Sequence, residues 1–211
     1  MNMKTVRIAL LALALAAVSC GGPADTTAGQ DGNAVLENIF NRKSVRSYTD
    51  QALSSGQIET LLRAAMAAPS GMNLQPWRFV VVTDPAVKQA LAGPRGGMIA
   101  SAPAVVVVCG ETMMQGRPAR EGGEPTLAPN GNWTADCAAA TENLLLAAEA
   151  LGLGAVWTAC YPYEERMSQA CAALGLPENV APYCIVPVGY PAGDEQPKDK
   201  WKPENVHYDK W

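Results

Sequence analysis

The sequence predicts a single α+β domain, and three observations support this fold class. Valine-rich runs bounded by proline and glycine, at residues 78–83 and 104–109, have the composition of buried strands. Segments with apolar residues at helical spacing precede and follow these runs. Of the 211 residues, 48% are hydrophobic and 17% charged, so the chain can form one sizeable core.

The first half of the chain predicts two helices and two strands. Residues 35–40 place four apolar side chains on one helical face. A second helix begins near Ser54 or Ser55, either of which can cap it, and ends before Pro69. The two strands follow, and residues 110–133, rich in Gly, Pro and Glu, predict a loop or lid.

The second half is dominated by an apolar segment at residues 134–151, which predicts a long helix that ends before Gly152. This helix has almost no polar face, so it must be covered on most sides, and a second subunit can supply part of that cover. Strands at 155–160 and 184–188 and a helix at 163–174 complete the α+β arrangement.

The first twenty residues have the character of an export signal. Lys4 and Arg7 precede an apolar run that is too short to span a membrane, and small residues precede Cys20, as in the bacterial lipobox. We predict a lipoprotein signal peptide at 1–20, a flexible tether at 21–33 and a folded domain at 34–211. The protein is then expected in the bacterial cell envelope, anchored to the membrane by lipid on Cys20 and facing the periplasm or the cell surface. An ordinary signal peptide cut elsewhere is the alternative.

Composition argues against several classes of function. A formal net charge of -4 and a pI near 5.1 disfavour nucleic acid as a partner. His207 is the single histidine, which disfavours zinc sites and mechanisms that need a histidine base. Five cysteines follow Cys20 without CxxC spacing, so free buried thiols are expected rather than disulfides.

Two segments carry candidate binding residues. The RKSVR sequence at 42–46 gathers three cations and a hydroxyl, which suits a phosphate, although a solvated basic turn would look the same. In the APSGMNLQPWRFVVV sequence at 68–82, a Pro-Ser-Gly turn lets the backbone approach a ligand closely. Asn73 and Gln75 add amide groups that can address the edge of a heterocycle. Either segment alone is a weak signal.

In this order and spacing, the two segments resemble the nitroreductase family. The resemblance continues through GLGAVWTACYP at 152–162 and into the C-terminal segment, so it covers about residues 35–211. It implies a nitroreductase-like fold with a central mixed sheet flanked by helices, and an intertwined homodimer. It also implies FMN at the subunit interface, with residues from both subunits at each flavin.

The resemblance also implies roles for individual residues. Arg42 and Ser44 match phosphate and ribityl contacts, and Arg46 the cation near the pyrimidine edge of the flavin. The turn is expected to reach the flavin from the partner chain, and the backbone after Trp157 to lie against the ring, with one amide N–H pointing at N5. The full set of expected cofactor-binding residues is Arg42, Lys43, Ser44, Arg46, Pro69, Ser70, Gly71, Asn73, Thr158, Ala159, Cys160, Lys198 and Lys200.

The function that the resemblance implies is an FMN-dependent oxidoreductase. NAD(P)H or another reductant would donate electrons, and a nitroaromatic, quinone or flavin would accept them, by ping-pong transfer through flavin N5. No catalytic side chain and no metal are then expected. Trp133, Tyr161 and Tyr163 are candidates for stacking on a substrate or for ordinary packing, and Cys160 for a redox thiol or a buried one.

Two alternatives stay open. One is a membrane-anchored flavin-binding protein that relays electrons without a dedicated small-molecule substrate. The other is a structural lipoprotein without cofactor. If the chain is exported, it meets little free nicotinamide cofactor, and reduction by NADH or NADPH is expected to be slow.

Overall fold

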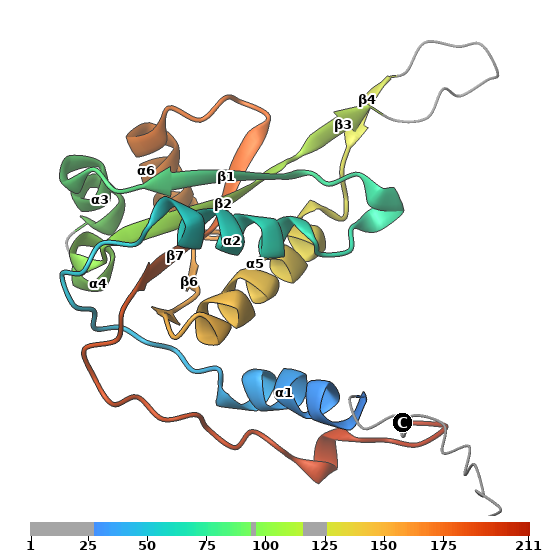
Figure 1. The fold of residues 1–211 in the computed structure, drawn as a ribbon. Helices are drawn as coiled ribbons and strands as arrows, with labels where there is room; N and C mark the ends of the chain where they lie inside the picture. Colours follow the sequence, from blue (N-terminus) through green and yellow to red (C-terminus); the bar gives the residue numbers. More distant parts are fainter. Residues whose placement is uncertain (1–27, 94–95, 116–125) are drawn as a thin grey trace, which may run out of the picture.

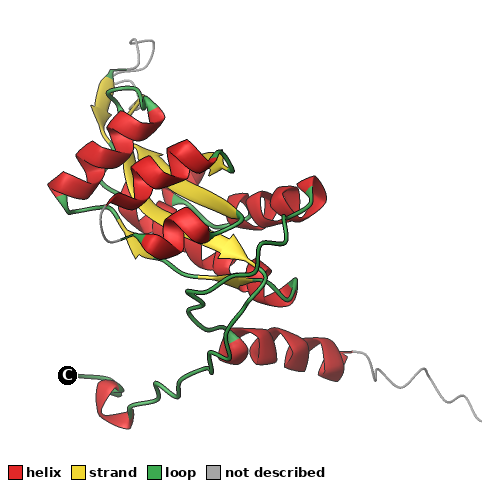
Figure 2. Ribbon diagram, turned by 90° about the vertical axis from the view of Figure 1, so that its left-hand side faces the viewer, coloured by secondary structure: helices red, strands yellow, loops and turns green. Residues whose placement is uncertain are grey.

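The structure is a computed structural model that describes residues 28–93, 96–115 and 126–211. Figure 1 shows a body of one sheet and its helices, from which the first helix and the C-terminal segment extend to one side. Figure 2 shows the same two segments standing away from the body in a perpendicular view. The predicted signal peptide with Cys20, and most of the predicted tether, lie outside the described residues.

The central sheet has the strand order β1-β2-β7-β5, with β6 also paired to β7. All pairs between these strands are antiparallel. The parallel component is an isolated bridge between Ser44 and Ala155, which attaches the RKSVR segment to the edge of the sheet. The predicted α+β class is therefore confirmed. The bounds are β1 Trp77–Val82, β2 Ala104–Glu111, β5 Gly154–Ala155, β6 Thr158–Ala159 and β7 Val180–Gly189.

Helices cover both faces of this sheet. Alternate residues of β2 point to opposite sides, so Val106 and Val108 pack into one core cluster and Val105 and Val107 into another. The first cluster lies under α2 (Ser55–Met66) and α5 (Trp133–Ala150), and the second under α3 (Pro85–Ala92), α4 (Gly97–Ser101) and α6 (Glu164–Leu174). Helix α1 (Ala28–Asn41) contacts α5.

Local sequence signals account for most of these boundaries. Ser54 caps α2 in a capping box with Gln57, as its spacing predicts. Helix α3 has no strong apolar pattern and is missed by the sequence, although Asp84 caps it and Pro85 occupies its first turn. The helix predicted at 134–151 is confirmed as α5.

Three expectations need correction. Helix α1 begins at Ala28, so it includes the end of the predicted tether. The predicted loop at 110–133 contains a hairpin of β3 (Met113–Gln115) and β4 (Leu127–Pro129), which Figure 1 shows projecting from the body. The strand predicted at 155–160 is split into β5 and β6, because Val156 and Trp157 do not join the regular ladder with β7.

The cysteines of the described chain are free, as expected, and four of the five are buried. Burial raises the pKa of Cys109 and Cys137 to about 12 and that of Cys160 to about 11. A thiol with so high a pKa forms little thiolate at neutral pH, which argues against a redox role for Cys160.

Among the residues that the structure describes, no helix is long and apolar enough to cross a membrane. The same residues contain no group of three or more His, Cys, Asp or Glu side chains placed to hold a metal ion.

Candidate functional site

The RKSVR segment is fixed along the edge of the sheet directly after α1. The Val45 N–H donates to the Ala155 carbonyl at 3.1 Å, and the Val45 side chain is buried. A Cβ atom at Gly154 would lie 2.5 Å from Val45 Cγ1, so the close approach requires glycine there. The buried valine therefore orients the neighbouring basic residues on this edge.

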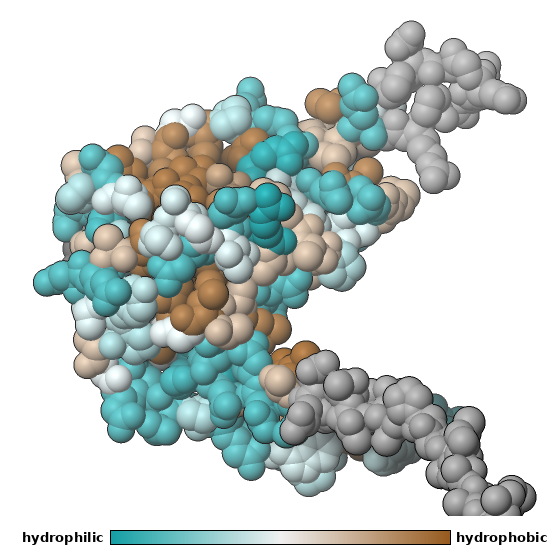
Figure 3. Space-filling view, viewed as in Figure 1, coloured by the Kyte–Doolittle hydropathy of each residue, from teal (hydrophilic) through white to brown (hydrophobic). Residues whose placement is uncertain are grey.

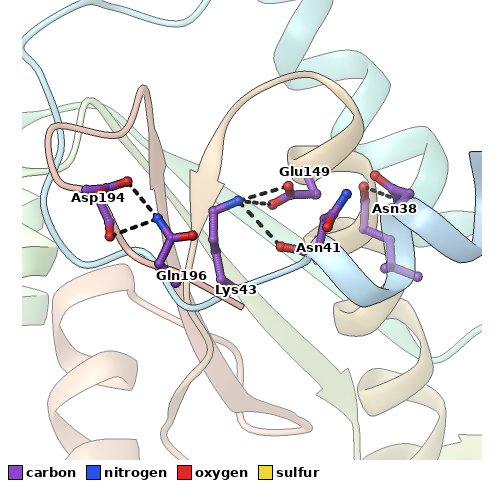
Figure 4. A network of polar contacts seen from close by, with 7 residues as sticks. Asn38, Asn41, Lys43, Glu149, Asp194 and Gln196 are labelled. Carbon is purple, nitrogen blue, oxygen red and sulfur yellow. Dashed lines mark hydrogen bonds and ion pairs between the residues drawn. The ribbon is translucent and has the colours of Figure 1, made fainter. Parts of the chain in front are cut away.

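The cations of this segment differ in their partners. Arg42 Nε lies 3.2 Å from Glu142, and Lys43 Nζ lies 3.0 Å from Glu149, both carboxylates of α5. Figure 4 shows Lys43 between the end of α1 and Glu149. Arg46 is exposed, and its guanidinium forms no salt bridge among the described residues, although its backbone N–H bonds to the carboxylate of Glu195. A guanidinium has five N–H donors, so Arg42 can hold Glu142 and still donate to a ligand.

The C-terminal arm, residues 190–211, begins along this segment. The Thr49 N–H donates to the Tyr190 carbonyl at 2.9 Å, and the Ala192 N–H to the Ser47 carbonyl at 3.0 Å. Glu195 Oε1 accepts from the Arg46 N–H at 3.2 Å and from the Ser47 hydroxyl at 3.3 Å. The Arg46 N–H bond is the main cause that holds the pKa of Glu195 below its usual value.

These hydrogen bonds fix the position of the chain just before the basic pair of the arm, Lys198 and Lys200. A cavity of about 400 Å³ lies between Lys43, Glu149 and residues 191–197. Lys198 and Lys200 follow it directly, are exposed, and have no acidic partner in the described part of the chain. The structure therefore anchors the start of the arm beside the RKSVR segment.

The Pro-Ser-Gly turn is held in an unusual backbone conformation. Met72, Asn73 and Gln75 have backbone φ values of 52°, 56° and 52°, which residues other than glycine rarely adopt. Hydrogen bonds hold it: the Gly71 N–H donates to Asp136 Oδ1 at 2.9 Å, and the Gln75 N–H to Ser70 Oγ at 3.0 Å. Such strain is frequent where a backbone contacts a ligand.

The turn and Lys43 are attached near opposite ends of α5. The turn is bonded to Asp136 in the first turn of this helix, and Lys43 to Glu149 in its last turn. At a rise of about 1.5 Å per residue, these two attachment points are about 20 Å apart along the helix, whereas Glu142, the partner of Arg42, lies about 9 Å from Asp136. One chain therefore separates the turn from Lys43 by most of the length of α5.

The segment after Trp157 borders a second cavity, of about 490 Å³, on the α3, α4 and α6 side of the sheet. Thr158, Ala159 and Cys160 line it together. Cys160 N–H donates to the Tyr183 carbonyl at 3.0 Å. Thr158 Oγ1 is enclosed and has no hydrogen-bond partner within the described residues. A buried hydroxyl of this kind is available to a ligand.

Aromatic side chains adjoin the same segment. Trp133 packs edge-to-face on Tyr161, with ring centroids 5.0 Å apart, and Tyr183 contacts both Trp133 and Trp157. The candidates Trp133 and Tyr161 thus pack on each other. Tyr163 is exposed and lies under the guanidinium of Arg166, 4.9 Å from the ring centroid.

Sequence reasoning missed three residues that organise the site: Asp136, Glu195 and Arg166. Asp136 had a visible signal, because it is the only charged residue in the first two turns of an otherwise apolar helix. Glu195 had none, since it acts through a contact with a residue distant in sequence. Arg166 contacts a carbonyl only seven residues earlier, across the start of α6, and no helical or strand spacing marks that contact.

Known proteins resemble this chain over most of its length. The model of the Nitroreductase family matches residues 39–105 and 91–190. An Archaeoglobus fulgidus protein provisionally named NADH dehydrogenase/NAD(P)H nitroreductase is 40% identical over 181 residues, which cover 83% of this chain and 98% of that protein.

Solved structures confirm the predicted nitroreductase-like fold. A Bacteroides thetaiotaomicron protein with the same provisional name has a TM-score of 0.75 and 45% identity, over 85% of this chain and 99% of that one. A provisionally named nitroreductase from Desulfovibrio desulfuricans, in complex with FMN, has a TM-score of 0.65 and 29% identity, over 84% of this chain and 97% of that one.

Proposed function

This chain belongs to the nitroreductase family, and from this premise we propose that it is an FMN-dependent oxidoreductase that uses NAD(P)H to reduce a small acceptor. A nitroaromatic, a quinone or a free flavin is the acceptor class that we propose. The observation that carries the proposal is that the anchored arm meets the RKSVR segment. The side chains of Arg46, Lys198 and Lys200 form no salt bridge among the described residues, so their charges are available to a phosphate.

The residues present fit FMN. Unpaired cations suit its phosphate, and Arg42 keeps donors free for it. Thr158 Oγ1 offers an enclosed hydroxyl without a partner, and the backbone of Ala159 and Cys160 borders the same cavity. These groups would hold the phosphate and the ring, respectively.

FMN, when bound, would supply the redox chemistry that links the donor to the acceptor. The protein would position the cofactor and shield it from water. Its cations would neutralise the phosphate, and the backbone of residues 158–160 would fix the orientation of the ring. The apolar wall of Met98, Ile99 and Ile185 keeps water from one side of the cavity.

We also propose a homodimer in which each site uses both chains. The attachment points of Gly71 and Lys43 on α5 are about 20 Å apart along the helix in one chain. A second copy can bring its turn to the first copy's cations. Apolar side chains of α1 are exposed in the single chain, as expected if a partner covers them.

Purification and turnover test this function. We expect a yellow protein that releases FMN, not FAD, on denaturation, identified by chromatography. Anaerobic stopped-flow absorbance should show bleaching by NADH or NADPH, followed by recovery with nitroaromatic or quinone acceptors. Slow bleaching by both nucleotides is the result expected if export separates the protein from them. Bleaching by dithionite alone, without acceptor turnover, would favour the electron relay. A colourless protein that binds no added FMN would contradict both.

The location in the cell envelope stays a proposal that rests on the sequence around Cys20. We expect Cys20→Ala to move the protein from the membrane fraction to the soluble one, or to leave it unprocessed, because this cysteine is the proposed attachment point of the lipid. Fractionation and immunoblotting check this, with Cys171→Ala as the control. A processed Cys20→Ala protein still in the membrane fraction would show another anchor.

A further inference from the structure

The cavity of about 490 Å³ beside β6 has one apolar wall and one polar side. Leu91, Met98, Ile99 and Ile185 form the apolar wall. The polar side comes from α6, whose Glu165, Arg166 and Gln169 line the cavity. A volume of this size suits a small organic molecule, and a few polar groups in an apolar cavity usually fix its orientation.

Arg166 is held in place at this cavity. Its Nη1 donates to the Ala159 carbonyl at 3.0 Å, and its guanidinium lies 4.9 Å from the centroid of the Tyr163 ring. These two contacts leave other N–H donors of the fork unengaged. Arg166 forms no salt bridge with any carboxylate of the described residues, Glu165 included.

The geometry points to Arg166 as the anchor for an anionic group on the acceptor, so that the preferred substrates are small aromatic compounds bearing a carboxylate or a sulfonate. The inference rests on the proposed function, because it concerns the acceptor of that reaction. An unpaired, pre-positioned guanidinium binds a carboxylate in a bidentate manner at little entropic cost. The apolar wall would hold the aromatic ring of the acceptor. The cavity is small for a whole dinucleotide, which favours the acceptor over the donor as the anion bound here.

Glu165 gives this inference a second test. Its carboxylate lines the same cavity and would repel an anionic acceptor, so its removal should act in the opposite direction. If Arg166 and Glu165 only stabilised α6, replacing them would not change activity toward an anionic acceptor in opposite directions.

The experiment compares 4-nitrobenzoate with the neutral 4-nitrobenzyl alcohol, which have similar size. We expect Arg166→Gln to lower kcat/KM for 4-nitrobenzoate by about 10- to 100-fold more than kcat/KM for the alcohol, because only the anionic acceptor loses a charge-assisted contact. The loss of the bond to the Ala159 carbonyl should affect both acceptors alike. Arg166→Lys should restore part of the loss, and Glu165→Gln should favour 4-nitrobenzoate by about 2- to 5-fold. Arg63→Gln is the matched control, since Arg63 is an exposed helical arginine on α2, outside the cavity lining.

Isothermal titration calorimetry of 4-nitrobenzoate into the oxidised protein, without donor, should rank the affinities of these variants in the same order as their kcat/KM values for this acceptor. This readout separates the inference from the proposed function, because it does not need turnover. Equal losses for both acceptors would overturn the inference. So would weaker FMN binding in Arg166→Gln, or a raised KM for NADPH alone, because the guanidinium would then contact the cofactor or the donor.

Discussion

Replacing both lysines of the basic pair, in the Lys198→Ala/Lys200→Ala variant, is expected to weaken FMN binding by about 100-fold or more. Each charge-assisted contact to a phosphate contributes about 1.5 to 3 kcal/mol, and two such contacts are lost. Neither lysine has an acidic partner in the described chain, so the substitutions remove ligand contacts and leave the fold intact. Quenching of FMN fluorescence during titration of the apoprotein measures the dissociation constant.

The arm offers a matched control for this variant. Lys202 and Lys210 lie on the same exposed arm, outside the basic pair, so the Lys202→Ala/Lys210→Ala variant removes the same charge. Its affinity for FMN should change little, apart from a small effect that salt screens. An equal loss in both variants would mean that the arm acts through its overall charge. Unchanged affinity in the first variant would refute the phosphate assignment.

The second large effect is expected at α1. Val35, Leu36, Ile39 and Phe40 are exposed in the single chain, with Phe40 at 70%. Figure 3 shows further apolar patches, in brown, on the face of the molecule that it displays. If a partner covers α1, the Leu36→Glu/Phe40→Glu variant should be monomeric at micromolar concentration and should lose most of its FMN. Burying two carboxylates in an apolar interface is strongly unfavourable.

Light scattering after size-exclusion chromatography gives the mass, and the absorbance of the same peak gives the flavin content. Both substituted residues are exposed within one chain, so the monomer should still fold, which circular dichroism checks. Glu37→Gln, on the same helix, is the control and should stay dimeric. A wild-type protein that is monomeric and carries FMN would contradict the shared site.

The sequence by itself determined the fold class, the main strands, the long helix α5 and the family. These follow from local patterns: the period of apolar residues, the caps and turn residues, and motifs whose residues are neighbours in the chain. Ser54 and Gln57 illustrate this, because a capping box lies within a single turn. Most of the candidate site residues could be picked out for the same reason, because they belong to motifs of neighbouring residues.

Only the tertiary structure decided how these pieces meet. Glu195 reaches Arg46 across a large separation in sequence, and Asp136 holds Gly71 in the same way. Such contacts depend on how strands pair and helices pack, which no local pattern encodes. The separation of the turn and Lys43 along α5, and the unpaired guanidinium of Arg166 at its cavity, likewise follow from packing. The sequence thus named the candidate binding groups, and the packing of helices on the sheet decided which of them one chain can bring together.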